Sequence, residues 1–306
     1  MGMNLPETID ATSFDTMQCD TARWRDVVAS IAAAYSSAPC QPTTAGTVLV
    51  GLVGEELVVK LYPPFLRDHS EFEQAALQQF GGRLSVPTPR LVASGERDGW
   101  PYLVMTQLTG APLTRVWPTL PERQKCELLA ALGRLAAEVH ALPPGRLADL
   151  APDWPAFVEG QRARCRQRQQ RTQLPAHLLA QLEPFLAGDL PAGPGVILTG
   201  EYTPMNLLYT PASGAGGLAG MFDFGDGLVG PREYDWLGPL CFLAAGHKER
   251  CDAFLAGCGA PSHRDWRPGL MRLLLLHRYS HLRVQISLKG WERAESFDAL
   301  AALLWP

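Results

Sequence analysis

The chain has 306 residues, of which 46% are hydrophobic and 19% charged, and its formal net charge at pH 7 is −4. This length and composition predict a folded protein with a large core, as one big domain or two lobes, and exclude collagen-like and disordered classes. The acidic balance disfavours nucleic acid as a partner. The longest apolar stretch, GLMRLLLLH at 269–277, is too short and interrupted to cross a bilayer, so we expect no membrane association.

The N-terminus and the cysteines indicate where the protein works. The first residues, MGMNLPETIDATSFD, are polar and acidic and do not resemble a secretory signal. The 7 cysteines are an odd number without a C-x-x-C pair, which suggests neither a disulfide framework nor a zinc site. We therefore expect a soluble, cytoplasmic protein with free thiols.

The first third of the chain predicts a small sheet with two helices. Apolar and β-branched runs flank Gly54-Glu55, and a second pair of runs flanks Asp98-Gly99, so each dipeptide marks the turn of a hairpin. Apolar residues at helical spacing precede the first hairpin and separate the two. The expected elements are a helix over 24–35, a hairpin over 43–62, a helix over 69–80 and a hairpin over 87–108.

The rest of the chain is predicted to be mostly helical. The exception is a hairpin over 206–224, whose turn is rich in Gly, Ser and Pro. Long helical patterns cover 121–142, 155–190 and 269–288. The fold class is therefore α+β, with a small β-rich lobe over 1–108 and a larger helical lobe over 109–306.

Two motifs of the second half carry chemistry together. In LTGEYTPMNLLY, Glu201 stands five residues before Asn206, and MFDFGDG places Asp223 after the expected hairpin. Phosphoryl transfer needs a carboxylate near the attacking hydroxyl, and it needs hard oxygen ligands for magnesium. Glu201 fits the first role, and Asn206 and Asp223 fit the second.

Lys60 adds a cation to this set. It lies near the end of the first hairpin, in LVVKLY, where its ammonium can reach nucleotide phosphates. An acid of the following helix would form an ion pair with it; Glu73 is the preferred candidate and Glu71 the alternative. The alternative is a lysine on an edge strand that discourages aggregation.

In this order, the motifs resemble those of the aminoglycoside phosphotransferase family, which shares the bilobal protein-kinase-like fold. The family's H-G-D-x-x-x-x-N has its counterpart in Thr199-Gly200-Glu201 to Asn206, and its I-D-F segment in Phe222-Asp223-Phe224. The resemblance covers residues 43–305. Within the family, the strand WPYLVM and a C-terminal Leu-Trp-Pro are most similar to hygromycin B phosphotransferases.

The resemblance implies a cofactor site for ATP (or GTP) and Mg²⁺. Lys60, paired with Glu73, would contact the phosphates, and Asn206 and Asp223 would hold the metal. The adenine edge would meet the backbone of three residues, Thr106, Gln107 and Leu108. The first lobe would bind the nucleotide, and the second would carry the catalytic loop and the acceptor-binding helices.

The catalytic position holds Glu201 where the family has Asp, one methylene shorter. We expect a shifted backbone that still lets Glu201 meet the acceptor hydroxyl; an altered acceptor or a weak enzyme are the alternatives. Thr199 replaces the usual His, which points to a rearranged loop.

Acceptor-binding residues are less defined by the sequence. The candidates are Asp226, His277 and Tyr279, the last two on a late helix. Asp235 is interpreted as a buried acid that braces the catalytic loop, with a substrate carboxylate as the alternative. An arginine-rich stretch, QRARCRQRQQR at 161–171, is interpreted as a solvated helix face. If this helix lined the acceptor site instead, it would argue against a polycationic substrate.

The leading hypothesis is a monomeric, ATP- and Mg²⁺-dependent O-phosphotransferase that acts on a small hydroxylated molecule. An aminoglycoside such as hygromycin B is the expected acceptor, with antibiotic resistance as the outcome. Two alternatives remain. One is a nucleotide-binding pseudokinase that works as an interaction module, and the other is a kinase for a metabolite such as an amino alcohol or a sugar.

Overall fold

The computed structural model describes residues 5–43, 46–200, 202–211, 217–261 and 265–306. The chain forms two compact units. The first comprises Met1–Arg83, Pro87–Thr109 and Phe222–Asp226, and the second comprises Leu84–Val86, Gly110–Met221 and Gly227–Pro306. The short segment 222–226 therefore belongs to the first unit although the chain on either side of it belongs to the second.

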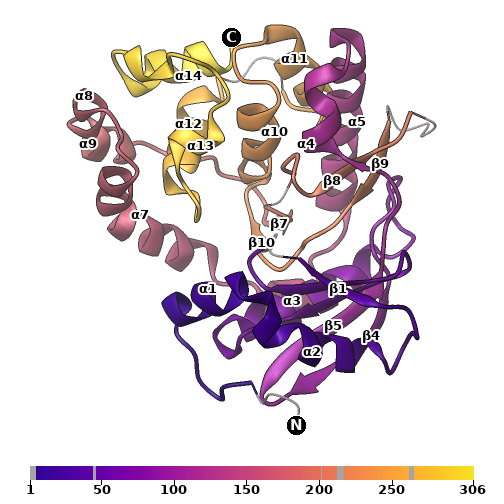
Figure 1. The fold of residues 1–306 in the computed structure, drawn as a ribbon. Coiled ribbons are helices and arrows are strands. Elements are labelled where there is room, and N and C mark those ends of the chain that lie inside the picture. The colour runs from indigo at the N-terminus through magenta and orange to yellow at the C-terminus, as the bar shows by residue number, and fades with distance from the viewer. Residues whose placement is uncertain (1–4, 44–45, 201, 212–216, 262–264) are drawn as a thin grey trace. The chain divides into compact units, whose positions relative to one another are not determined.

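An antiparallel sheet with the strand order β1-β2-β3-β5-β4 forms the first unit (Figure 1). The two expected hairpins are β2–β3 and β4–β5, and both are confirmed. At the turn of the second, Asp98 and Gly99 have φ angles of 52° and 82°, the left-handed conformation that Asp and Gly adopt most readily. The strands are β1 (Cys40–Thr43), β2 (Leu49–Val53), β3 (Leu57–Leu61), β4 (Leu91–Arg97) and β5 (Trp100–Thr106).

The side chains of β3 alternate between two surroundings, as the period of two along a strand requires. Val59 and Leu61 join the apolar core that α1 (Ala11–Cys19) and α2 (Thr21–Ala32) build around Trp24. Lys60 points instead to α3 (Arg67–Phe80), which packs on β4 and β5. The sheet thus separates an apolar layer from a layer that carries charge.

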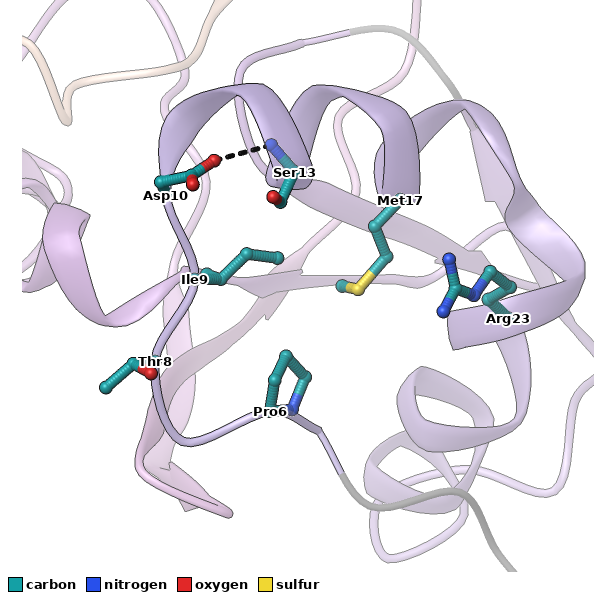
Figure 2. A pocket seen from close by; sticks show the side chains of 7 residues that line it. All are labelled: Pro6, Thr8, Ile9, Asp10, Ser13, Met17 and Arg23. Carbon is teal, nitrogen blue, oxygen red and sulfur yellow. Dashed lines mark hydrogen bonds between the residues drawn. The ribbon is translucent and has the colours of Figure 1, made fainter.

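The N-terminal helices also border a surface pocket. Figure 2 shows Asp10, whose carboxylate accepts a hydrogen bond from the backbone N–H of Ser13 at 2.8 Å and so caps α1. The pocket is lined by Pro6, Thr8, Ile9, Asp10, Ser13, Met17 and Arg23. The Asp10 carboxylate at this pocket therefore already serves as the N-cap of α1.

The second unit is mostly helical, with two small antiparallel sheets. The expected helix over 121–142 is α5 (Glu122–Ala141), which packs closely against α11 (Lys248–Gly257) at the small residues Gly133 and Gly257. The other α-helices are α4 (Leu113–Val116), α6 (Arg146–Leu150), α7 (Trp154–Arg171), α8 (Ala176–Leu179), α9 (Leu182–Leu186), α10 (Leu237–Phe242), α12 (Arg267–Leu276), α13 (Leu282–Gln285) and α14 (Phe297–Leu304).

The strands of this unit frame the catalytic-loop motif. One sheet has the order β6-β8-β9, from β6 (Ala111–Pro112), β8 (Leu207–Tyr209) and β9 (Leu218–Met221). The other pairs β7 (Val196–Leu198) with β10 (Leu228–Gly230). The pairing of β8 with β9 confirms the expected hairpin. In the sequence, the catalytic-loop motif lies between β7 and β8.

Two long helices expected from the sequence are shorter in the structure. The stretch over 155–190 divides into three helices, α7, α8 and α9, and these helices are separated by turns. The late stretch over 269–288 divides into α12 and α13, because α12 ends at Leu276 and His277, with ψ 143°, leaves the helical conformation. Among the described residues, no helix combines the length and the apolar character needed to cross a membrane.

Candidate active site

Lys60 is the centre of a buried ion cluster within the first unit. Its Nζ lies 2.7 Å and 2.9 Å from the two carboxylate oxygens of Glu73, and 2.7 Å from Oδ1 of Asp223. Lys60 exposes 7% of its surface and Glu73 none. The structure thus brings together three of the residues singled out in the sequence, and it selects Glu73 over Glu71 as the partner of Lys60.

The position of β3 in the sheet explains this burial. β3 lies between β2 and β5 and is no edge strand, which excludes the alternative interpretation of Lys60 as an edge lysine. Burial by itself lowers the pKa of the Lys60 ammonium, but the Asp223 and Glu73 carboxylates outweigh it and leave this pKa above its ordinary value. Lys60 is therefore a fixed cation at any physiological pH.

Asp223 has the features of a ligand-binding carboxylate. Its φ angle of 73° lies in the left-handed region, where non-glycine residues are uncommon and often functional. Its side chain is 35% exposed, and the ion pair with Lys60 uses Oδ1. Within the described part of the chain, Oδ2 thus remains for a further partner, and a carboxylate oxygen is a hard ligand of the kind that magnesium prefers.

α3 also holds the rest of the 222–226 segment. The backbone N–H of Phe224 donates to Oε1 of Glu73 at 3.4 Å, and the Phe224 ring packs edge-on against Phe80. His69 Nδ1 lies 3.2 Å from Oδ1 of Asp226. Asp226, a candidate for acceptor binding, is therefore paired with a residue of its own unit.

The segment after β5 has one backbone donor to offer a ligand. The N–H of Thr106 donates to the Arg90 carbonyl at 2.9 Å, and the N–H of Gln107 donates to the Glu56 carbonyl at 2.7 Å. The N–H of Leu108 donates to no residue in the part of the chain that the structure describes. Of the three residues expected at the adenine edge, Leu108 is thus the one with an available donor.

A second buried carboxylate, Asp235, organises the loop motif within the second unit. It exposes 2% of its surface. Its oxygens accept hydrogen bonds from the backbone N–H of Gly200 at 2.7 Å and of Thr199 at 3.2 Å, while His140 Nε2 lies 2.9 Å away. The interpretation of Asp235 as a structural brace is confirmed. Glu201 itself lies outside the described residues, directly after this braced backbone.

The residues that follow Glu201 are firmly held. Tyr202 is 1% exposed, and burial together with Asp235 raises its pKa well above the ordinary value. Asn206, the expected metal ligand, is 8% exposed, and its backbone N–H donates to the Thr203 carbonyl at 3.1 Å. Asn206 belongs to the second unit and Asp223 to the first, so their joint role stays a prediction.

His277 and Tyr279 lie in the turn after α12. The His277 ring stacks on Tyr234, with ring centroids 4.9 Å apart, and its Nδ1 accepts a hydrogen bond from the Tyr279 N–H. These contacts stop the helix, although the apolar pattern continues. Burial, and then Arg278 and Arg168, lower the pKa of His277 to about 3, so the ring is neutral. Tyr279 remains 47% exposed.

The arginine-rich helix α7 is not simply a solvated face. Arg162 donates to the Leu186 carbonyl, and Arg168 donates to the carbonyls of Leu275 and Arg278. Arg166 pairs with Glu183. These arginines bind groups beyond their own helix, α7, which the helical pattern alone gave no reason to expect.

Sequence reasoning missed several partners of the expected residues. Tyr62 donates to Glu73, His69 pairs with Asp226, and His140 meets Asp235. The period of the strand placed Lys60 and Tyr62 on one face, and this was the signal that could have found Tyr62. The other two pairings depend on the fold and left no local signal.

A buried lysine held between two carboxylates, and a loop motif braced at Gly200, are features that phosphoryl transfer of the kinase type requires. The model of the phosphotransferase enzyme family matches residues 43–271, more than half of the chain. The chain belongs to this family. Both the expected class of enzyme, an O-phosphotransferase, and the expected protein-kinase-like α+β fold are confirmed.

Solved structures of phosphotransferases have the same fold. Wild-type aminoglycoside 2'-phosphotransferase-IIIa, a GDP complex, has a TM-score of 0.67 at 17% identity, over 92% of this chain and 97% of the other. Aminoglycoside phosphotransferase APH(3'')-Id from Streptomyces rimosus, with ADP and streptomycin, has a TM-score of 0.61 at 18% identity, over 83% and 98%. Macrolide 2'-phosphotransferase MphH from Brachybacterium faecium has a TM-score of 0.58 at 18% identity, over 92% and 98%.

Proposed function

We propose that the chain transfers the γ-phosphoryl group of ATP or GTP to a hydroxyl of an antibiotic, with an aminoglycoside such as hygromycin B as the leading acceptor. The observation that carries the proposal is the Lys60 cluster: the buried ion pair of Lys60 and Glu73 adds little stability over apolar residues of similar size, so a functional role is its better explanation. The named relatives of the same fold, which bind guanine or adenine nucleotides and streptomycin, support the choice of substrates.

In this proposal the first unit binds the nucleotide. Lys60, held by Glu73, contacts the phosphates as a permanent cation, and the backbone of Thr106, Gln107 and Leu108 meets the base. The available N–H of Leu108 makes it the donor of choice for the adenine edge. A buried, pre-oriented cation costs no reorganisation when charge develops during transfer.

The residue types at the metal positions fit magnesium. Asp223 offers a carboxylate oxygen beside the one bound to Lys60, and Asn206 offers an amide oxygen. Mg²⁺ held by these two residues would neutralise negative charge on the phosphates. Because Lys60 pairs with Asp223 in the described structure, metal binding competes with that ion pair, and Glu73 keeps Lys60 in place.

Glu201 is proposed to orient the acceptor and to take its proton. The acceptor oxygen bonds to the γ-phosphorus, the bond from that phosphorus to the β-phosphate oxygen breaks, and the proton of the hydroxyl passes to the Glu201 carboxylate. Asp235 holds the backbone of Gly200, the residue directly before Glu201 in the sequence. Asp226, His277 and Tyr279 remain candidates for acceptor contacts, with Tyr279 the most accessible.

The test is phosphorylation itself. Purified protein is incubated with Mg²⁺, ATP or GTP, and a panel that contains hygromycin B, other aminoglycosides, a macrolide, an amino alcohol and simple sugars. Mass spectrometry is expected to show a phosphate adduct on an antibiotic, and adducts on the metabolites alone would move the proposal to a metabolite kinase. No adduct on any acceptor, with nucleotide still bound, would point to the pseudokinase.

The role of Glu201 has its own variant. Glu201→Gln removes the proton acceptor and keeps the size of the side chain, so turnover is expected to fall roughly 100-fold or more while ATP affinity stays near that of the wild type. Glu127→Gln, on the exposed i,i+4 pair with Arg123, is the matched control. Unchanged turnover in Glu201→Gln would remove this residue from the mechanism.

A further inference from the structure

Tyr62 touches the ion cluster from the same strand region as Lys60. It directly follows β3, exposes 1% of its surface, and its backbone N–H donates to the Pro101 carbonyl at 2.8 Å. Its hydroxyl donates to Oε2 of Glu73. We infer that Tyr62 is a positioning residue for phosphoryl transfer: it fixes the Glu73 carboxylate, which in turn holds Lys60. The inference rests on the proposed role of Lys60 toward the nucleotide.

The donors around Glu73 show what Tyr62 contributes. Oε1 accepts from Lys60 at 2.7 Å and from the Phe224 N–H at 3.4 Å. Oε2 accepts from Lys60 at 2.9 Å and from Tyr62. Each oxygen thus has one bond from the lysine and one from a group attached to the fold. Without the Tyr62 hydroxyl, the flexible lysine is the one donor left to Oε2 of this buried carboxylate among the residues that the structure describes.

The competition for Lys60 explains why this matters for function. Asp223 is as close to the Lys60 ammonium as Glu73 is, with 2.7 Å in both cases. A Glu73 that can turn away leaves Lys60 nearer to Asp223, where it occupies a proposed metal ligand and leaves the proposed phosphate position. Tyr62 therefore supports both the phosphate contact and the metal site through one hydrogen bond.

The hydroxyl remains a donor at all working pH values. Burial, and then the neighbouring Glu73 carboxylate, raise the pKa of Tyr62 well above its ordinary value, so the oxygen keeps its proton. An ionised carboxylate only accepts hydrogen bonds, and a protonated phenol has one hydrogen to give. The direction of the bond is thereby fixed, and Phe at this position removes the bond with little change of volume.

The experiment is a double-mutant cycle with Tyr62→Phe and Glu73→Gln, and with Tyr102→Phe as the control. Tyr102 lies on β5 of the same sheet, and its hydroxyl faces Tyr35 at 3.5 Å, away from the cluster. Tyr62→Phe is expected to lower kcat/KM for ATP roughly 10- to 100-fold. The KM for the acceptor substrate is expected to stay within about twofold of the wild-type value. In the Glu73→Gln background the same change is expected to cost less than about twofold, because the neutral Gln amide no longer pairs with Lys60 as an ion and Tyr62 then has no carboxylate to fix.

Two results would overturn the inference. One is a Tyr62→Phe variant that keeps kcat/KM for ATP within about twofold of the wild type, and the other is a loss of equal size in both backgrounds. If Tyr62→Phe melts below the assay temperature, melting temperatures are compared instead. If the double variant has the same melting temperature as Glu73→Gln, the result supports the coupling. If Tyr62→Phe lowers the melting temperature by the same amount in the wild type and in Glu73→Gln, the result overturns it.

The failure of the proposed function is a separate outcome. If the wild type phosphorylates no acceptor, the same four proteins are titrated with Mg-ATP by calorimetry. Weaker binding on Tyr62→Phe in the wild-type background alone supports the positioning role without any turnover. Equal weakening in both backgrounds, or none in the wild type, overturns it.

Discussion

Two buried carboxylates, one in each unit, perform opposite tasks with the same chemical group. Glu73 holds a side-chain cation, Lys60, whereas Asp235 holds backbone N–H groups of the catalytic-loop motif. Glu73 belongs to a cluster in which charges balance charges, and Asp235 fixes the course of the chain before Glu201. The comparison teaches that burial of an acid does not by itself reveal its role; the donors around it do.

The largest expected effect comes from removing the charge of Lys60 from its ion cluster. Lys60→Met keeps the length of the side chain but leaves Glu73 fully buried without its cation, which destabilises the fold by about 3 kcal/mol. Turnover is expected to fall roughly 100- to 1,000-fold, because the proposed phosphate contact is lost. Steady-state rates and urea denaturation measure the two effects.

Lys248→Met is the matched control for this variant. Lys248 pairs with Asp252 at the surface, in an exposed i,i+4 arrangement. Its loss is expected to change the free energy of unfolding by less than about 0.5 kcal/mol and to leave turnover unchanged. If Lys60→Met behaved like this control, the cluster would have neither a structural nor a functional role.

The next largest effect tests the brace. Asp235→Asn replaces one carboxylate oxygen by an NH₂ group, which then faces backbone N–H groups or the His140 ring. We expect a loss of about 2 kcal/mol in the free energy of unfolding and a drop in kcat of roughly 10-fold or more, with the affinity for Mg-ATP preserved. This split between turnover and nucleotide binding would separate the brace from the Lys60 cluster.

Asp252→Asn, at an exposed acid of the same unit, controls for the amide substitution. Equal losses of kcat and of nucleotide affinity in Asp235→Asn would show that the two carboxylates do not have distinct tasks. Rates at saturating ATP, calorimetric titration with Mg-ATP and thermal melts are sufficient to decide this.

The sequence predicted one of these carboxylate environments better than the other. The positions of Lys60 and Glu73 could be predicted from local patterns, because Lys60 lies on a strand and Glu73 on the amphipathic helix that follows it in the chain. The connection between the two elements is short, which makes their pairing predictable as well. The bond from His140 to Asp235 joins residues 95 positions apart. No periodicity specifies such a contact, since it depends on how α5 packs in the folded unit.

The late helical pattern was misleading for a related physical reason. The apolar run of α12 continues past its end, yet His277 leaves the helix because its ring stacks on Tyr234 and its Nδ1 meets the Tyr279 N–H. Tertiary contacts of this kind override local propensity. The same applies to α7, where the arginine pattern looked solvated but Arg168 binds carbonyls after and within α12.

His277 offers the smallest effect and extends the comparison to a buried group that stays neutral. Its ordinary pKa of 6.5 is lowered to about 3 in the folded chain. Between these values the unfolded chain binds a proton that the folded chain does not, so the stability contributed by this ring is complete above pH 6.5 and is lost as the pH falls. Going from about pH 6.5 to about pH 5.5 should cost about 1 kcal/mol at this site.

His277→Gln removes the titrating ring and keeps an acceptor for the Tyr279 N–H. Its free energy of unfolding is expected to fall less steeply than that of the wild type over this pH interval, whatever constant offset the lost stacking adds. Parallel curves for His277→Gln and the wild type would mean that the His277 ring takes up its proton in the folded chain as readily as in the unfolded one. The buried His277 ring would then carry a positive charge without a carboxylate partner. The contrast between buried charges that are paired, such as Lys60, and a buried ring that stays neutral would fail.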